Sequence, residues 1–260
     1  MNDESVHQLL ETQSPTLALV AVQKILHALP RHARREKLRR VLAVADALFV
    51  VRLFEAALYE SGLRQAAGQD VLVVVLSLFL EDNKESHDDV LALWRAAAFQ
   101  LNLLQTYGLL ECVDDVREGE AQHYVLEHPK SFAAQGMTLG HRVAKARVAT
   151  EKEMEPLLLD PDAKVMEAML GHPRLTEQHV LFAIRQKSAT SAVLNVVVKS
   201  SFGKRATVAY ALAQARQMLA SSALWILPYL SAKERHSLSV SSQSNSVVRA
   251  MMAKIVPSSS

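Results

Sequence analysis

The sequence predicts an all-α protein with an N-terminal helical domain that carries one short β-hairpin, followed by a C-terminal stack of about three helical hairpins. The 260 residues include only 8 glycines and 8 prolines, well below the usual share of these turn-forming residues. Apolar residues recur at spacings of three and four along most of the chain, which is the pattern of amphipathic helices. The predicted domains are residues 1–135 and 136–256, and residues 257–260 are expected to form a disordered tail.

The N-terminal domain is predicted to contain four helices. They span residues 16–29, 34–59, 71–80 and 90–107. Ser14 and Pro15 supply an N-cap and a first-turn proline for the first of them. The apolar run of the third is about half as long as a bilayer span requires, so we expect a buried core helix and no membrane association.

One β-element is predicted near residues 109–126. Leu109–Val113 and His123–Leu126 flank a turn-rich segment, which is typical of a short hairpin. A helix followed by a hairpin is also similar to the end of a winged-helix domain, a fold that usually binds DNA. Because the intervening segment is rich in Asp and Glu, it would repel phosphates. A structural hairpin is therefore the favoured interpretation, and DNA binding by a winged-helix-like element is the alternative.

The segment 157–185 has the pattern of a helical hairpin with its end signals in place. Asp160 is the expected N-cap of the first helix and Pro161 its first residue. Gly171 is the expected left-handed C-cap, and Thr176 is the expected N-cap of the second helix. Such hairpins bury their apolar faces only against neighbouring copies, so this segment predicts a helical repeat.

Further helices with the same spacing follow. They are expected over residues 189–200, 204–216, 222–230, 231–239 and 246–256. Gly203 marks a turn, and Ser231 with Glu234 matches a capping box. Together these helices extend the stack to about three hairpins.

Three motifs in this region resemble a known family. They are T-L-G-H-R-V-A-K-A-R at Thr138–Arg147, L-L-x-D-P-D ending at Asp162, and H-P-R-L-T-E at His172–Glu177. The sequence of residues 136–256 is similar to bacterial HEAT-like helical repeat proteins, in which the last motif usually begins with Asn where this chain has His172. A second Asn-Pro motif, expected near Gln214, is missing. The resemblance implies an α-solenoid of adaptor or scaffold type and no enzyme activity. Its structural repeat motif comprises Asp160, Pro161, Pro173, Arg174, Leu175 and Thr176.

Charge is divided unevenly between the two predicted domains. Residues 1–135 contain 13 Lys and Arg and 19 Asp and Glu, whereas residues 136–260 contain 16 and 8. The cations after Gln178 form a candidate interaction surface, which comprises Arg185, Lys187, Lys199, Lys204, Arg205, Arg216, Lys233, Arg235, Arg249 and Lys254. On one face of a solenoid they would suit an acidic protein, a nucleic acid or the acidic N-terminal half. Scattered surface cations are the alternative, and the denser run Arg31–Arg40 is expected to be a solvated helix start.

The sequence carries no signature of catalysis or of cofactor binding. Gly203-Lys204 lacks the spacing of a phosphate-binding loop, and no H-E-x-x-H or G-x-S-x-G motif occurs. Two groups of residues that could bind a metal have ordinary explanations. His87-Asp88-Asp89 is explained by an acidic helix start. His123 with Glu127 and His128 is explained by a hairpin surface, where two ligands rarely hold a metal. The sequence therefore predicts no enzyme, no metal and no cofactor.

The favoured function is a non-enzymatic scaffold or adaptor that binds protein partners through its helical repeats. The alternative is a nucleic-acid-binding protein whose basic C-terminal repeats contact phosphates. A cytoplasmic location is expected, because Cys112 is the only cysteine and the N-terminal residues are acidic and polar, unlike a secretory signal.

Overall fold

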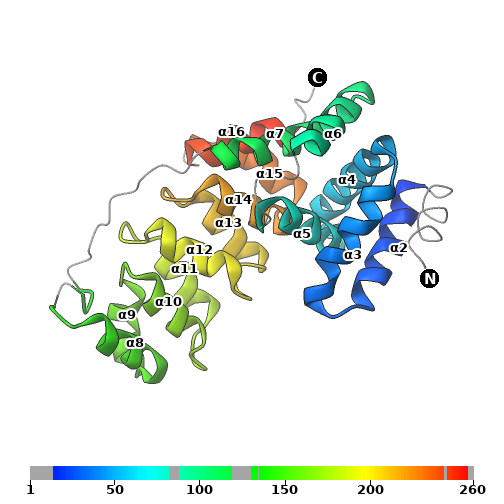
Figure 1. Cartoon of the computed structure of the whole chain (residues 1–260). Helices are drawn as coiled ribbons and strands as arrows, with labels where there is room; N and C mark the ends of the chain where they lie inside the picture. The colour runs from blue at the N-terminus through cyan, green and yellow to red at the C-terminus, as the bar shows by residue number, and fades with distance from the viewer. Residues whose placement is uncertain (1–13, 82–87, 119–129, 134, 243–244, 257–260) are drawn as a thin grey trace. The chain divides into compact units, whose positions relative to one another are not determined.

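The computed structural model describes residues 14–81, 88–118, 130–133, 135–242 and 245–256. These residues divide into two units; Figure 1 colours the chain by residue number. Unit 1 lies within Met1–Gly119, Leu227–Val240 and Arg249–Ser260, and unit 2 lies within Glu120–Ile226 and Ser241–Val248. The division differs from the predicted one, because the segments 227–240 and 249–256 group with the N-terminal helices instead of with the repeats.

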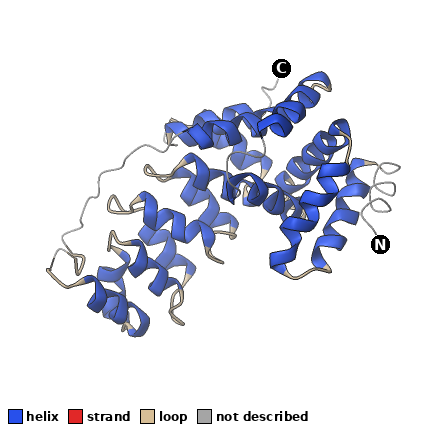
Figure 2. Cartoon of the chain, in the orientation of Figure 1, coloured by secondary structure: helices blue, strands red, loops and turns tan. Residues whose placement is uncertain are grey.

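The regular structure of both units is helical (Figure 2). Unit 1 contains α2 (Pro15–His27), α3 (Arg31–Val44), α4 (Ala47–Gly62), α5 (Ala66–Glu81), α6 (Asp88–Gln100), α7 (Leu104–Glu118), the 3-10 helix η2 (Leu227–Tyr229) and α15 (Ala232–Val240). Unit 2 contains α8 (Leu139–Val148), α9 (Glu151–Leu158), α10 (Ala163–Leu170), α11 (Glu177–Ile184), α12 (Ser191–Lys199), α13 (Ala206–Gln214) and α14 (Ala220–Ile226). The last helix, α16 (Ser246–Ile255), lies in unit 1 from Arg249 onward. The all-α class is confirmed for the described part of the chain.

The predicted β-hairpin is wrong over its first strand. Leu109–Val113 lies inside α7, where Leu109, Leu110 and Val113 are buried. Their spacing places them on one side of a helix, and that side packs into the core of unit 1. The second predicted strand, His123–Leu126, lies outside the described residues. Because α7 continues where the first wing strand was expected, the winged-helix interpretation loses its support.

Two predicted long helices are each divided by a turn. The predicted helix 34–59 breaks between α3 and α4, where the Asp46 side chain accepts a hydrogen bond from the Leu48 N–H at 3.0 Å. The predicted helix 90–107 breaks at Asn102, whose φ of 55° follows the end of α6. Asparagine adopts this left-handed conformation more readily than most residues. Local side-chain chemistry therefore overrides the continuous apolar pattern at both places.

The central helix of unit 1 is α4, which contacts α2, α5, α6, α7, η2 and α15. Phe54 of α4 meets Phe79 of α5 and Trp94 of α6 edge to face, at ring-centroid distances of 6.3 and 5.4 Å. Such contacts add to the energy of burying the rings. The three aromatic residues thus hold three helices together in one core.

Arg235 of α15 joins the C-terminal part of unit 1 to α4. Its buried guanidinium donates hydrogen bonds to the Leu58 carbonyl (3.0 Å), the Ser61 hydroxyl (2.7 Å) and the Leu227 carbonyl (3.1 Å). Leu58 and Ser61 belong to the C-terminal end of α4, and the negative end of the helix dipole attracts a cation there. Burial lowers the pKa of Arg235 to about 10, so the side chain stays charged at neutral pH. Arg235 therefore caps α4 from a distant part of the sequence.

Two further contacts complete unit 1. The predicted capping box of α15 is confirmed, since the Ser231 N–H donates to Glu234 Oε2 at 2.7 Å and the Glu234 N–H donates to Ser231 Oγ at 3.3 Å. Gly108 lies inside α7 at its crossing with α16, where an added Cβ would overlap the carbonyl of Lys254. A glycine is required there because the two backbones touch.

The helices of unit 2 lie in two rows. In the first row α8, α10, α12 and α14 contact one another in that order, and in the second row α9, α11 and α13 do so. Figure 1 shows them following one another from green at α8 to orange at α14. Hydrogen bonds join equivalent places in successive hairpins: the Thr190 hydroxyl donates to the Pro161 carbonyl, 29 residues away, at 3.0 Å. The hairpin of α10 and α11 is thus joined to that of α12 and α13 by a polar contact as well as by apolar packing.

The predicted N-cap of α10 is wrong by two residues. Asp162 caps this helix by accepting a hydrogen bond from the Lys164 N–H at 2.9 Å. Asp160 is instead a buried ion-pair partner, because both of its carboxylate oxygens accept from Nη1 of Arg142 on α8. Its Oδ1 also accepts from the Asp162 N–H at 3.0 Å. These contacts compensate the cost of burying the carboxylate.

Of the two other predicted helix-end residues of this hairpin, Gly171 was predicted wrongly and Thr176 correctly. Gly171 ends α10 with a φ of −85°, so the predicted left-handed C-cap is wrong. Thr176 is confirmed as the N-cap of α11, because its hydroxyl accepts from the His179 N–H at 3.4 Å. Nδ1 of His179 accepts from the Thr176 N–H at 3.2 Å, which completes a capping box with histidine in the place usually taken by Glu or Gln.

His172 supplies a hydrogen-bond acceptor in the turn between α10 and α11. The side chain is buried, and its Nδ1 accepts from the Arg174 N–H at 3.2 Å. An asparagine oxygen accepts from the residue two places later in the same way. The histidine therefore preserves the turn between α10 and α11.

We expect His172→Ala to lower the free energy of unfolding of unit 2 by about 1–2 kcal/mol, because it leaves the Arg174 N–H without an acceptor and removes a buried side chain. His172→Asn retains an acceptor and is expected to cost less than half as much. Thermal denaturation of both variants checks this. Equal losses in the two variants would mean that the ring nitrogen has no role in the turn.

Candidate functional site

The candidate interaction surface predicted from charge is divided between the two units. Six of its cations lie in unit 2, and Lys233, Arg235, Arg249 and Lys254 lie in unit 1. Arg235 is wrong as a surface residue, because its side chain is only 2 % exposed and caps α4. Lys254 pairs with Glu111 at 3.7 Å. The ten cations therefore do not form one strip along the repeats.

Within unit 2 the six remaining cations lie at opposite edges. The turn between α12 and α13 carries Lys204 and Arg205, and Lys199 ends α12. The turns that follow α11 and α13 carry Arg185, Lys187 and Arg216. Because the chain reverses direction in each hairpin, these two sets of turns lie at opposite ends of the helices. The second set comes from neighbouring helices of one row, so its cations gather at one edge.

At the first edge Arg205 has a structural partner. It donates to Glu177 of α11 at 3.1 Å, and the Thr207 hydroxyl donates to the same carboxylate. These hydrogen bonds, that of Thr207 foremost, lower the pKa of Glu177. The Arg205 guanidinium also lies 4.6 Å from the centre of the Phe202 ring. This cation thus ties α11 to the start of α13.

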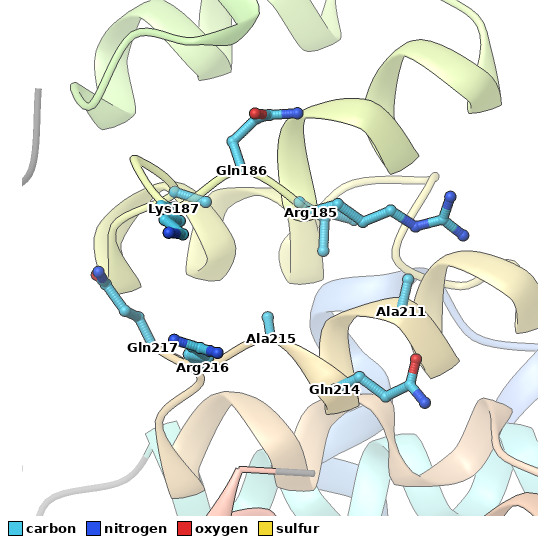
Figure 3. Close-up of a pocket in the computed structure, with 10 residues that line it drawn as sticks. Arg185, Gln186, Lys187, Ala211, Gln214, Ala215, Arg216 and Gln217 are labelled. Carbon is cyan, nitrogen blue, oxygen red and sulfur yellow. The ribbon is translucent and has the colours of Figure 1, made fainter. Parts of the chain in front are cut away.

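The second edge contains a pocket of about 400 Å³, which we name the turn pocket. It lies between the ends of α11 and α13 (Figure 3). Its lining comprises Ile184, Arg185, Gln186, Lys187, Ala189, Ala211, Gln214, Ala215, Arg216 and Gln217. Figure 3 shows Lys187 and Arg216 on the same side of the pocket as Gln217, while Arg185 extends toward the other side. The turn pocket therefore combines three cations with three amides and an apolar floor.

No carboxylate lines the turn pocket among the described residues. Arg185, Lys187 and Arg216 are exposed. The floor is formed by small or buried side chains, among them Ile184, Ala189 and Ala211. Oε1 of Gln217 is buried, and it accepts no hydrogen bond from the part of the chain that the structure describes. The arrangement is suited to holding an anionic group.

The six residues of the predicted repeat motif lie within the hairpins and the turns of unit 2. Asp160 is buried against Arg142, and the Pro161 carbonyl accepts from Thr190. Leu175 is buried, whereas Pro173 and Arg174 are exposed in the turn before α11. Thr176 caps α11. The motif therefore builds the hairpins and does not line the turn pocket.

Sequence reasoning missed Arg142, Glu153 and the glutamines of the turn pocket. Arg142 is paired with Asp160, 18 residues later, and no local spacing indicates that contact. Glu153 pairs with Lys145, which joins α9 to α8. Nothing in the spacing of Gln186, Gln214 and Gln217 indicates that they line one pocket.

Glu153 should make unit 2 sensitive to acid. Hydrogen bonds from Lys145 and Thr150 hold the pKa of Glu153 at about 2, below its ordinary value of 4.5. A depressed carboxylate pKa stabilises the folded state above the ordinary value, and this contribution is lost as the pH falls toward 2. We expect the melting temperature of the native chain to fall more steeply between pH 4.5 and 2 than that of Glu153→Gln. The control is Glu151→Gln, in the same first turn of α9, and its melting temperature should follow that of the native chain. If the melting temperatures of all three proteins fell in parallel with pH, the prediction would be contradicted.

The structure offers no candidate metal centre among its described residues. Asp89 lies in the first turn of α6, and His87 and the group of His123, Glu127 and His128 lie outside those residues. Cys112 is buried, and its Sγ lies 3.8 Å from the Met251 carbonyl, a packing role. Within the same part of the chain, no helix reaches the length and apolar character of a membrane span.

A second pocket, of about 350 Å³, lies in unit 1. It is bordered by α3, α4, α5 and α6, and its lining is mostly apolar, with Phe79, Leu93 and Trp94 among its residues and Arg39 at its edge. Leu93 is 58 % exposed. An exposed apolar surface of this kind is more typical of protein contacts than of phosphate contacts.

No family model matches the chain, and no curated protein and no solved structure shows a significant match to it.

Proposed function

We propose that the protein is a non-enzymatic scaffold or adaptor, in which unit 2 is a HEAT-like solenoid of three helical hairpins that binds a protein partner. The observation that carries this proposal is the turn pocket, an open concavity where neighbouring hairpins bring three cations and an apolar floor together. The predicted repeat motif accounts for the hairpins on which the pocket is built. Stacked helical hairpins typically present such surfaces to other proteins.

The row arrangement of unit 2 supports this function. The helices α8 to α14 bury their apolar faces against one another, so the exposed turns are free to vary without loss of the core. The hydrogen bonds from Thr190 to Pro161 and from Arg205 to Glu177 hold successive hairpins in a fixed register. A rigid edge suits a binding role because little conformational freedom is lost when a partner docks.

The position of the cations favours a protein partner over a nucleic acid. Binding to a phosphate backbone requires a track of cations along the path of the strand. Here Arg235 is buried, Arg205 pairs with Glu177, and the cations of unit 2 lie at two opposite edges. The exposed apolar lining of the pocket in unit 1 is a second surface suited to protein contact.

An affinity capture tests the proposed function. The full chain is immobilised and exposed to a cell extract, with and without nuclease treatment, and the retained material is identified by mass spectrometry. We expect at least one protein to be retained in both extracts at a defined stoichiometry. Retention of nucleic acid alone, or loss of every protein after nuclease treatment, would contradict the proposal.

A further inference from the structure

We propose that the turn pocket receives an acidic peptide segment of the partner protein, with a carboxylate held by Lys187 and Arg216 and a neighbouring apolar side chain resting on the alanine floor. This inference rests on the proposed function and specifies the chemistry of its partner. It assigns the binding role to three of the ten predicted cations, namely Arg185, Lys187 and Arg216.

The charge of the turn pocket points to an anionic ligand. Arg185, Lys187 and Arg216 lie in the same lining, and no carboxylate of the described residues accompanies them there. A helix C-terminus attracts one or two cations through its dipole, which accounts for a cation after α11. The same effect accounts for a cation after α13, but the packing of α11 against α13 places Lys187 and Arg216 on one side of the same concave surface. Convergent like charges repel one another unless an anion lies between them.

The floor of the turn pocket points to a peptide instead of a small inorganic anion. Apolar surface beside the cations comes from Ile184, Ala189, Ala211 and Ala215. A bound phosphate ion would leave that surface exposed to water. A peptide places a carboxylate and an apolar side chain within a few residues of each other. It also supplies N–H donors, and Oε1 of Gln217 has no hydrogen-bond donor among the described residues.

The same lining disfavours single-stranded nucleic acid as the ligand. Proteins that bind single strands stack bases on aromatic side chains, and no aromatic residue lines the turn pocket. The cations at the opposite edge, Lys199 and Lys204, do not continue the charge of the pocket along one path. An acidic peptide segment matches the mixed lining better.

A binding experiment with a charge-matched control tests the inference. The probe is a fluorescein-labelled octapeptide of alternating Glu and Leu, and its anisotropy is followed as the full native chain is added at low salt. The test variant is Lys187→Glu with Arg216→Glu, and the control is Lys199→Glu with Lys204→Glu, which changes the net charge by the same amount at the opposite edge. All four positions are exposed, and thermal denaturation verifies that both variants stay folded.

We expect the native chain to bind the peptide and the test variant to bind it at least about tenfold more weakly, whereas the control should stay within about twofold of the native affinity. An octapeptide of alternating Gln and Leu should bind at least about tenfold more weakly than the acidic one. Equal weakening by both variants would reduce the effect to net charge and overturn the inference. Tighter binding of an eight-nucleotide oligo-dT that the test variant abolishes would assign the pocket to nucleic acid, and no binding of the acidic peptide to the native chain would also overturn it.

The outcome separates this inference from the proposed function. If the acidic peptide does not bind but the affinity capture still retains a protein equally on the native chain and on the test variant, the scaffold proposal stands and the assignment of the turn pocket is wrong. If neither the peptide nor any protein is retained, both are wrong.

Discussion

Arg142→Met is expected to lower the free energy of unfolding of unit 2 by about 3–5 kcal/mol. The Asp160 side chain is fully buried, and both of its oxygens accept hydrogen bonds from Arg142. Methionine fills much of the volume of the arginine stem but leaves the carboxylate without its cation. Removing the cation from a buried ion pair is strongly destabilising, because it leaves an uncompensated buried charge.

The chain offers a clean readout for this variant. It contains two tryptophans, Trp94 in unit 1 and Trp225 in unit 2, so Trp94→Phe leaves a fluorescence signal from unit 2 alone. Urea titrations in that background compare Arg142→Met with Arg147→Met, an exposed arginine of the same helix. The control should lose less than about 0.5 kcal/mol. Similar losses in the two variants would show that the buried ion pair does not hold α8 against the turn before α10.

Arg235→Met is expected to destabilise unit 1 by about 3 kcal/mol or more. The substitution removes donors from two buried carbonyls, Leu58 and Leu227, and from the Ser61 hydroxyl. It also removes the positive charge at the end of α4, the helix that contacts most of the others in unit 1. In a Trp225→Phe background the fluorescence of Trp94 reports the unfolding of unit 1 in urea.

The exposed neighbour Lys233 provides the control, since Lys233→Met should leave the urea midpoint unchanged. The location of the effect matters as much as its size. Arg235→Met is therefore also measured in the Trp94→Phe background, where Trp225 reports unit 2. If the substitution shifted only that transition, α15 would belong to the repeats, as the sequence had suggested, and the grouping of α15 with the N-terminal helices would be wrong.

The helical class was predictable because it depends on composition and on apolar spacing, which the whole chain shows. The hairpin at Leu109–Val113 was predicted wrongly because turn-forming residues after it outweighed its own spacing. Leu109, Leu110 and Val113 fit one side of a helix, and long-range packing in unit 1 decides in favour of that helix. A short apolar run does not distinguish a strand from a buried helix without its tertiary neighbours.

The ends of helices were predictable where one side chain determines them. Thr176 and the pair of Ser231 with Glu234 act as expected, because capping needs only neighbours within three residues. Asp160 was misplaced because a cap and a buried ion-pair partner have the same sequence appearance. Its true partner, Arg142, lies 18 residues earlier, and only the packing of α8 against α10 brings the two together.

The candidate site was predictable only in part. Charge alone identified Arg185, Lys187 and Arg216, and the alternation of turns explains why they separate from Lys199, Lys204 and Arg205. Charge alone also included Arg235, because a sequence shows that a residue is basic but not that it is buried. The glutamines and the alanine floor of the turn pocket follow from how α11 and α13 stack, which no local pattern encodes.

Hydrogen–deuterium exchange on the full chain tests the central claim most directly, namely that a protein partner docks on the turn edge of unit 2. The exchange of the native chain is measured alone and with the captured partner. The account predicts slower exchange in peptides that cover residues 184–190 and 214–219, with little change around Lys199 and Lys204 at the opposite edge. Slower exchange confined to unit 1, or to the edge that carries Lys199 and Lys204, would contradict it.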